Sequence, residues 1–139
     1  ISFFSGRNLN EIIKTVEKEL PELKTWSDYN KLSLNEGETK FMAFHQDVKL
    51  CINGVEIERV YETKFLGIII DNKLSWKPHI EYIRNKVAKT IGILFKIKDL
   101  INIKGLHIIY SSLVMPYLSY CSEVWGNANK TIIDKLVNL

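Results

Sequence analysis

The sequence predicts an α+β protein, in which a long helix and a small antiparallel sheet with a hairpin precede a bundle of helices. Apolar residues recur at helical spacing over residues 9–26 and again after residue 75. Between these stretches apolar and polar residues alternate, and an Asn-Gly pair separates two short apolar runs. A spacing of apolar residues that changes from helical to strand-like and back to helical is typical of this fold class.

The first helix is expected to begin after Asn8, which forms a capping-box-like start with Glu11 three residues later. Pro21 lies inside the helical pattern and cannot donate a backbone hydrogen bond, so we expect a kink or a break there. Because the apolar stripe continues past this proline, the pattern favours the kink.

The central part of the chain predicts short strands near residues 31–34 and 40–44. Residues 50–57 carry the clearest hairpin signal, because Asn53 and Gly54 accept the positive φ angles of a type I′ turn. Residues 65–70 form a short apolar run rich in β-branched side chains, which predicts one buried strand.

After residue 72 the pattern is helical, with Ser75 as the expected N-cap and Pro78 in the first turn. Two more helices are expected, over residues 103–115 and from residue 131, and Pro116 should bend or restart the chain. In the helix that follows Ser75, six apolar residues form one face. They are Ile80, Ile83, Val87, Ile91, Leu94 and Phe95.

Positive charge is concentrated in the second half of the chain. Residues 1–58 contain 7 Lys or Arg and 10 Asp or Glu, whereas residues 59–139 contain 12 and 6. On a helical wheel, Lys86, Lys89 and Lys96 fall together opposite the apolar face, and Arg84 lies nearer that face. Such a row of lysines favours binding to a polyanion.

The composition excludes several other classes. Hydrophobic residues make up 46% and charged residues 25% of the chain, which are globular values, and no apolar run reaches the roughly 18 residues of a membrane span. Cys51 and Cys121 are isolated, and His45, His79 and His107 are far apart, so no zinc site is expected. The aspartates include no adjacent pair of the kind that two-metal catalysis needs.

Three segments, taken in order, resemble the reverse transcriptases of non-LTR, LINE-type retrotransposons. They read NKLSLNEGETKFMAF from residue 30, KFLGIIIDNKLSWKPHI from residue 64 and SLVMPYLSYCSEVWG from residue 112. The resemblance implies that residues 1–72 are the C-terminal part of a polymerase palm and residues 73–139 a truncated helical thumb. It also implies a protein that binds an RNA/DNA template-primer and the missing N-terminal palm and fingers. The resemblance further implies that this protein is intracellular, either cytoplasmic or nuclear, and does not bind a membrane.

The resemblance assigns roles to residues. Residues 30–44 resemble motif D, in which Leu34-Asn35 and Thr39-Lys40 match the family and Glu38 departs from it. The resemblance places Lys40 near the leaving pyrophosphate. Phe65, Leu66 and Gly67 resemble motif E, the primer grip, whose hairpin holds the 3′ end of the primer. The residues alone leave alternatives open, namely a solvated lysine and a glycine at a bulge in a core strand.

Four basic residues resemble the thumb helix that follows a nucleic-acid duplex and contacts successive phosphates. They are Arg84, Lys86, Lys89 and Lys96. The alternative for all four is the solvated polar face of an amphipathic helix.

In this family an Asp-Asp segment holds two Mg²⁺ ions, and that segment would precede residue 1. The chain is therefore expected to hold no metal or other cofactor and to be inactive alone, whereas the intact enzyme uses Mg²⁺. Two alternatives from other classes remain open. One is a non-catalytic nucleic-acid-binding module, and the other is a structural or interaction domain, or a relic.

Overall fold

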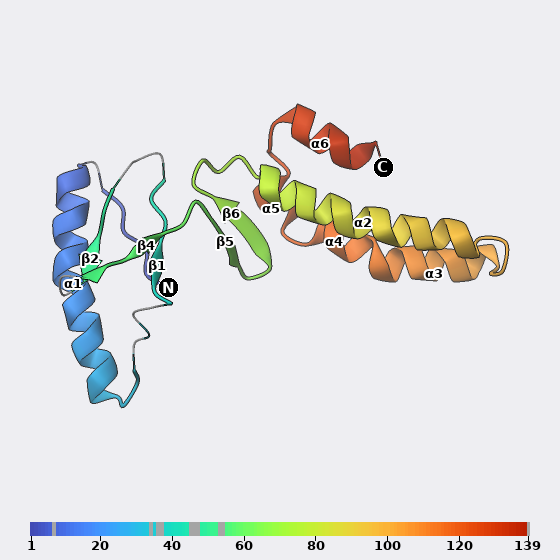
Figure 1. Ribbon diagram of the computed structural model, residues 1–139. Coiled ribbons are helices and arrows are strands. Elements are labelled where there is room, and N and C mark those ends of the chain that lie inside the picture. The colour runs from blue at the N-terminus through green and yellow to red at the C-terminus, as the bar shows by residue number, and fades with distance from the viewer. Residues whose placement is uncertain (7, 34, 36–37, 45–47, 53–54, 139) are drawn as a thin grey trace. The chain divides into compact units, whose positions relative to one another are not determined.

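The computed structural model describes residues 1–6, 8–33, 35, 38–44, 48–52 and 55–138 (Figure 1). A long helix is followed by the short strands and then by the remaining helices of the described chain, which confirms the α+β class. The chain divides into two compact units, Ile1–Tyr61 and Glu62–Leu139. This division lies before the expected boundary at residues 72–73, so the hairpin that carries Phe65 and Gly67 folds with the helices that follow it.

The first unit is organised by α1 (Leu9–Tyr29). The Asn8 side chain accepts a hydrogen bond from the Asn10 N–H at 3.0 Å, which confirms the predicted N-cap. The helix is continuous through Pro21, so no break occurs there. Val16 and Ser27 are the buried residues of this helix.

The strands of the first unit are all two residues long. β2 (Cys51–Ile52) and β3 (Val55–Glu56) pair antiparallel, which confirms the predicted hairpin, although its turn at residues 53–54 lies outside the described residues. β1 (Lys40–Phe41) pairs in parallel with β4 (Glu58–Arg59). The predicted antiparallel sheet is therefore wrong for this pair, because the hairpin strands already pair with each other and β1 pairs with the residues that follow them.

The second unit begins with β5 (Glu62–Phe65) and β6 (Ile68–Asp71), which pair antiparallel. The single buried strand predicted for residues 65–70 is wrong. Leu66 and Gly67 form the turn between the two strands, with φ angles of 46° and 85°. Two positive φ angles in a two-residue connection are the signature of a type I′ turn, and the glycine makes the second of them inexpensive. The prediction failed because apolar residues lie on both sides of the turn, so the sequence pattern resembles one continuous strand.

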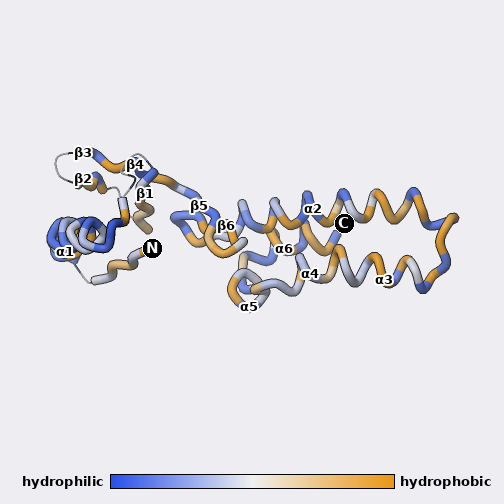
Figure 2. The backbone as a smooth tube through the Cα atoms, turned by 90° about the horizontal axis from the view of Figure 1, so that it is seen from below, coloured by the Kyte–Doolittle hydropathy of each residue, from blue (hydrophilic) through white to orange (hydrophobic). Residues whose placement is uncertain are grey.

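The rest of this unit is helical: α2 (Lys77–Ile97), α3 (Ile103–Leu113), α4 (Met115–Ser119), α5 (Ser122–Trp125) and α6 (Lys130–Val137). Figures 1 and 2 show α2 and α3 side by side as a helical hairpin. The helix predicted over residues 103–115 ends at Leu113 and restarts as α4, whose second residue is Pro116. Proline cannot continue the hydrogen-bond ladder of α3 but is accepted in the first turn of a helix.

The core of the second unit gathers around the N-terminal half of α2. Ile80, Ile83 and Val87 are at most 3% exposed and pack with Val114 and Trp125. Phe95 was expected on the same face, but its side chain is 65% exposed. Phe95 lies near the C-terminal end of α2, whereas the buried cluster packs against the N-terminal half of the helix.

The connection from β6 to α2 is held by a buried carboxylate. Asp71 is 7% exposed and accepts hydrogen bonds from the N–H groups of Trp76 at 2.9 Å, Ser75 at 3.0 Å and Lys73 at 3.3 Å. Ser75 was the expected N-cap, but Trp76 occupies that position in the left-handed conformation, with φ at 61°. The Ser75 hydroxyl still accepts a hydrogen bond from the Lys77 N–H at 3.3 Å, whereas Asp71 binds N–H groups that precede the helix.

Apolar residues gather where α2 ends and α3 begins, as the hydropathy colours of Figure 2 show, and five of them have exposed side chains. Each of these five residues is more than half exposed. They are Ile93, Phe95, Leu100, Ile103 and Ile108. Among the helices that the structure describes, none combines the length and the apolar character needed to cross a bilayer.

Candidate nucleic-acid interface

Lys40 lies in the first unit, on β1, opposite Glu58 of β4. Its Nζ lies 2.9 Å from the Glu58 Oε2, and the two side chains are 47% and 59% exposed. An exposed ion pair of this kind contributes little to stability, and either partner is accessible to solvent. A role for Lys40 near a leaving pyrophosphate stays a prediction, and any such role requires the lysine to leave Glu58.

Phe65, Leu66 and Gly67 lie at the tip of the β5–β6 hairpin. Phe65 is half-buried, whereas the Leu66 side chain is 72% exposed. A Cβ atom on Gly67 would lie 3.4 Å from the Tyr120 ring, and its φ of 85° is one that side chains rarely adopt. Gly67 therefore permits both the turn and the close approach of the aromatic ring.

Tyr120 ties this tip to the helices. Its hydroxyl donates a hydrogen bond of 2.7 Å to the Leu66 carbonyl, across 54 positions of sequence. The Tyr120 carbonyl in turn accepts a bond of 2.9 Å from the indole Nε1 of Trp125, which is in the core. The tip of the hairpin is thus fixed by two successive hydrogen bonds to a buried side chain.

His79 makes a second connection between the hairpin and α2. Its Nδ1 accepts a hydrogen bond from the Ile69 N–H at 3.3 Å, and the side chain is 2% exposed. The edge of its ring meets Trp125 with the ring centroids 5.9 Å apart. Burial lowers the pKa of His79 below its ordinary value, which favours the neutral ring that can accept this bond.

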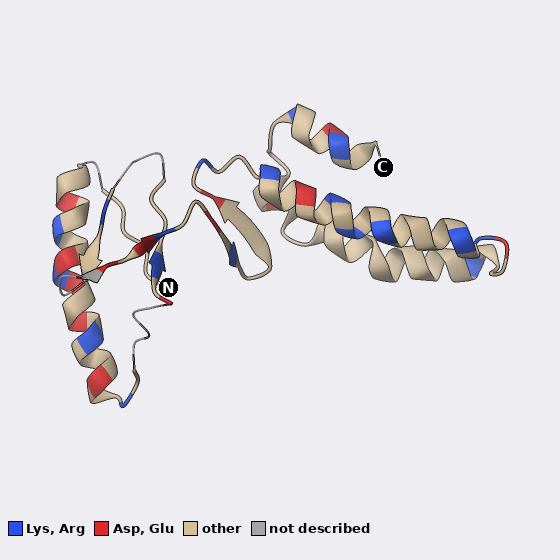
Figure 3. Cartoon of the chain, viewed as in Figure 1, with Lys and Arg blue, Asp and Glu red and all other residues tan. Residues whose placement is uncertain are grey.

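The predicted basic residues of α2 are all exposed. Lys89 and Lys96 lie on the side of the helix away from the buried face, Lys86 lies about 60° around the helix from Lys89, and Arg84 lies on another side. None of these four makes an ion pair with an acidic residue in the described ranges. Figure 3 shows basic residues spaced along α2, which contains five Lys or Arg and one acidic residue, Glu81.

The structure therefore brings the hairpin tip and the α2 lysines into one unit, with Tyr120, His79 and Trp125 between them. Sequence reasoning missed Tyr120 and gave His79 no role. Tyr120 lies in the third segment that resembles the reverse transcriptases, and this position was the sequence feature that could have indicated a role for it. No spacing rule relates it to Leu66.

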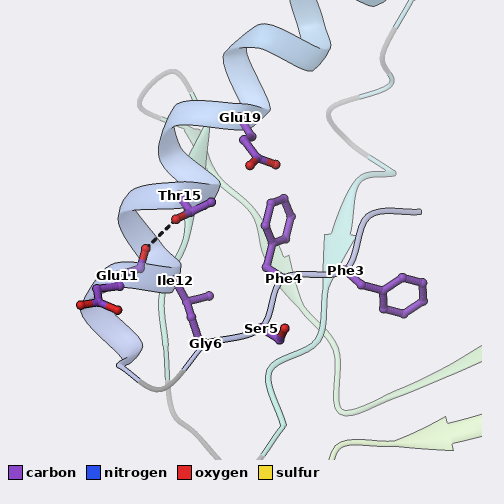
Figure 4. A pocket seen from close by; sticks show the side chains of 8 residues that line it. All are labelled: Phe3, Phe4, Ser5, Gly6, Glu11, Ile12, Thr15 and Glu19. Carbon is purple, nitrogen blue, oxygen red and sulfur yellow. Dashed lines mark hydrogen bonds between the residues drawn. The ribbon is translucent and has the colours of Figure 1, made fainter.

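A pocket in the first unit does not suit phosphate (Figure 4). Residues 3–6 and one side of α1 line it, and its two charged side chains are the carboxylates of Glu11 and Glu19. Thr15 donates its hydroxyl to the Glu11 carbonyl at 2.9 Å rather than offering it to a ligand. Within the described part of the chain, no three His, Cys, Asp or Glu residues gather into a group that could hold a metal ion.

Comparison with known proteins supplies relatives. The RNA-directed DNA polymerase from the mobile element jockey of Drosophila funebris is 25% identical over 134 residues, or 91% of this chain and 14% of that protein. The Pol polyprotein from the type-1 retrotransposable element R1 of Bradysia coprophila is 29% identical over 77 residues, or 53% of this chain and 8% of that protein. A probable RNA-directed DNA polymerase from transposon BS of Drosophila melanogaster is 21% identical over 142 residues, or 96% of this chain and 16% of that protein.

These relatives confirm the resemblance to the reverse transcriptases of non-LTR retrotransposons. This chain spans at most 16% of the length of each of these three proteins. No family model and no solved structure matches it.

Proposed function

We propose, from this likeness to retrotransposon polymerases, that the chain holds an RNA/DNA template-primer as the C-terminal palm and the thumb of a reverse transcriptase. Residues 1–72 would belong to the palm and residues 73–139 to the thumb. The observation that carries the proposal is a hairpin with Gly67 at its tip, hydrogen-bonded to the same helical unit that presents an exposed row of lysines.

The proposed binding is electrostatic and independent of base sequence. Lys86 and Lys89 are about one turn of α2 apart, and Lys96 lies about two turns further on. At this spacing their ammonium groups can contact phosphates along one strand. Each neutralised phosphate releases condensed counterions, so binding should weaken as salt rises. In this proposal Phe65, Leu66 and Gly67 support the primer end, and Arg84 reaches the duplex only by extending around the helix.

The salt dependence of binding tests this proposal. A variant with Lys86, Lys89 and Lys96 all changed to Gln should lose about 2.7 from the slope of log affinity against log salt, at about 0.9 per phosphate. Fluorescence anisotropy of a labelled RNA/DNA hybrid at several salt concentrations measures the slope.

The matched control changes Lys104, Lys130 and Lys135 to Gln, which removes the same charge from exposed positions on α3 and α6. Its slope should stay close to that of the unchanged chain. Equal losses in the two variants would show general attraction rather than a binding face. A chain that does not bind the hybrid at all would favour the structural alternative.

We also propose that the chain alone does not extend a primer, because its sequence contains no Asp-Asp pair to hold two metal ions. Mg²⁺ and the remaining palm and fingers would come with the intact polymerase, where Lys40 would screen or protonate the leaving pyrophosphate. A primed RNA template with Mg²⁺ and deoxynucleotides should show no product above background on a sequencing gel. Measurable extension would contradict this part of the proposal.

A further inference from the structure

Tyr82 of α2 lies within reach of two ammonium groups that come from different elements. The Nζ of Lys64, on β5, lies 5.3 Å from the centroid of the Tyr82 ring, and the Nζ of Lys86 lies 5.7 Å from it. Lys86 is one helical turn beyond Tyr82, whereas Lys64 reaches the ring only because the hairpin packs on α2. No role for Lys64 or Tyr82 was predicted from the sequence.

The ring itself is held in place. Tyr82 is half-buried, packs against the core, and stacks on His79 with the ring centroids 6.5 Å apart and an angle of 18° between the planes. His79 is in turn bound to β6 through the Ile69 N–H. The surface between hairpin and helix therefore has a fixed aromatic ring as its base.

The two lysines are not neutralised by protein groups. Neither makes an ion pair with any acidic residue in the described ranges, and both side chains are exposed. Like charges gathered at one ring repel each other, and a cation–π contact at an exposed site offsets only about 0.5–1 kcal/mol. An anion beside the ring would be attracted by both ammonium groups, and the contacts with the ring already limit the freedom of both side chains.

We propose that Lys64, Tyr82 and Lys86 form a binding site for one phosphodiester group of a nucleic-acid strand, at the junction of the β5–β6 hairpin and α2. This inference rests on the proposed function and extends it. Lys86 also begins the row that continues to Lys89 and Lys96, so a strand that follows α2 passes from the helix to the hairpin through this site.

The first test is the Lys64→Gln variant in the hybrid-binding assay. Its slope of log affinity against log salt should fall by about 0.9, so that raising salt from about 50 to 200 mM weakens its binding about 3.5-fold less than it weakens the unchanged chain. Lys64→Arg keeps the charge and should restore most of the slope. Lys73→Gln is the matched control, because Lys73 is an exposed lysine just after the hairpin and makes no cation–π contact in the described structure.

A slope for Lys64→Gln equal to that of the unchanged chain would overturn the phosphate site while leaving the proposed function intact. Far-UV circular dichroism verifies that each variant is folded.

The second test does not depend on duplex binding. Inorganic phosphate is titrated into the chain carrying isotope-labelled lysine side chains, and the NMR signals are assigned through the Gln variants. The Lys64 and Lys86 signals should shift together and saturate before the others. This result without any hybrid binding would support the site and contradict the proposed function. Uniform shifts at all exposed lysines would mean an adventitious ion only and would overturn the site.

Discussion

Replacing Trp125 with alanine is expected to lower the free energy of unfolding of the second unit by about 3–5 kcal/mol, the usual cost of deleting a buried large aromatic side chain. Trp125 is 5% exposed and packs with Ile80, Ile83, Val87 and Val114. The substitution also removes the Nε1 donor to the Tyr120 carbonyl. Urea unfolding followed by circular dichroism measures the change.

Trp26 provides the matched control for this prediction. It lies in α1 and its side chain is 58% exposed, so Trp26→Ala should cost less than about 1 kcal/mol. Similar losses for the two variants would show that Trp125 is not the anchor of the helical core. Because Trp125 also holds Tyr120, the Trp125 variant should bind the RNA/DNA hybrid more weakly under conditions where it remains folded.

Changing Asp71 to Asn is expected to lower the free energy of unfolding by about 1.5–3 kcal/mol near neutral pH, the range for hydrogen bonds to a charged group. The carboxylate accepts bonds from Lys73 and Ser75 at Oδ2 and from Trp76 at Oδ1. An amide keeps one acceptor oxygen and turns its NH₂ group toward the remaining N–H donors. The loop that sets the start of α2 should loosen as a result.

The same carboxylate predicts a pH dependence. Burial raises the pKa of Asp71, but the N–H groups of Ser75 and Trp76, the Ser75 hydroxyl and the Lys73 N–H together outweigh it, so the pKa lies below the ordinary 3.8. A carboxylate whose pKa is lower in the folded state stabilises the fold above its unfolded pKa. This contribution should be complete above about pH 4 and disappear as the pH falls below 3.8 through the folded pKa.

Unfolding curves from pH 6 down to the lowest pH at which the chain stays folded test this sign. The difference in free energy of unfolding between the unchanged chain and Asp71→Asn should shrink as Asp71 becomes protonated. Asp99→Asn is the control, since Asp99 is exposed on the loop between α2 and α3 and should show a small difference throughout. A gap for Asp71→Asn that stays constant with pH would contradict the assigned role of the carboxylate.

Local signals predicted the elements that depend on neighbouring residues. Asn8 caps α1 as its side chain suggested, the strands beside Asn53-Gly54 pair as a hairpin, and Ile80, Ile83 and Val87 form the buried face of α2. Each of these features follows from contacts within a few positions of sequence. Motif resemblance also identified the relatives, because the order of several motifs is a property of the sequence alone.

Predictions failed where a local pattern fitted two structures. The apolar run at residues 65–70 is compatible with one strand or with two strands and a turn, and only pairing along Glu62–Phe65 and Ile68–Asp71 selected the hairpin. Ser75 is an acceptable N-cap residue and its hydroxyl accepts a hydrogen bond from the Lys77 N–H, but the N-cap position is occupied by the next residue, Trp76. Hydropathy could not show that Phe95 would be exposed.

By itself, then, the sequence determined the fold class, the long helices, the basic residues of α2 and the likeness to retrotransposon polymerases, since periodicity, charge spacing and motif order are properties of the sequence. The tertiary structure alone decided that Tyr120 fixes the Leu66 carbonyl, that His79 binds β6, and that Lys64 joins Lys86 at Tyr82. These contacts join different elements of the fold. They exist because burial of Trp125 and the α2 face brings those elements together, which no local pattern encodes.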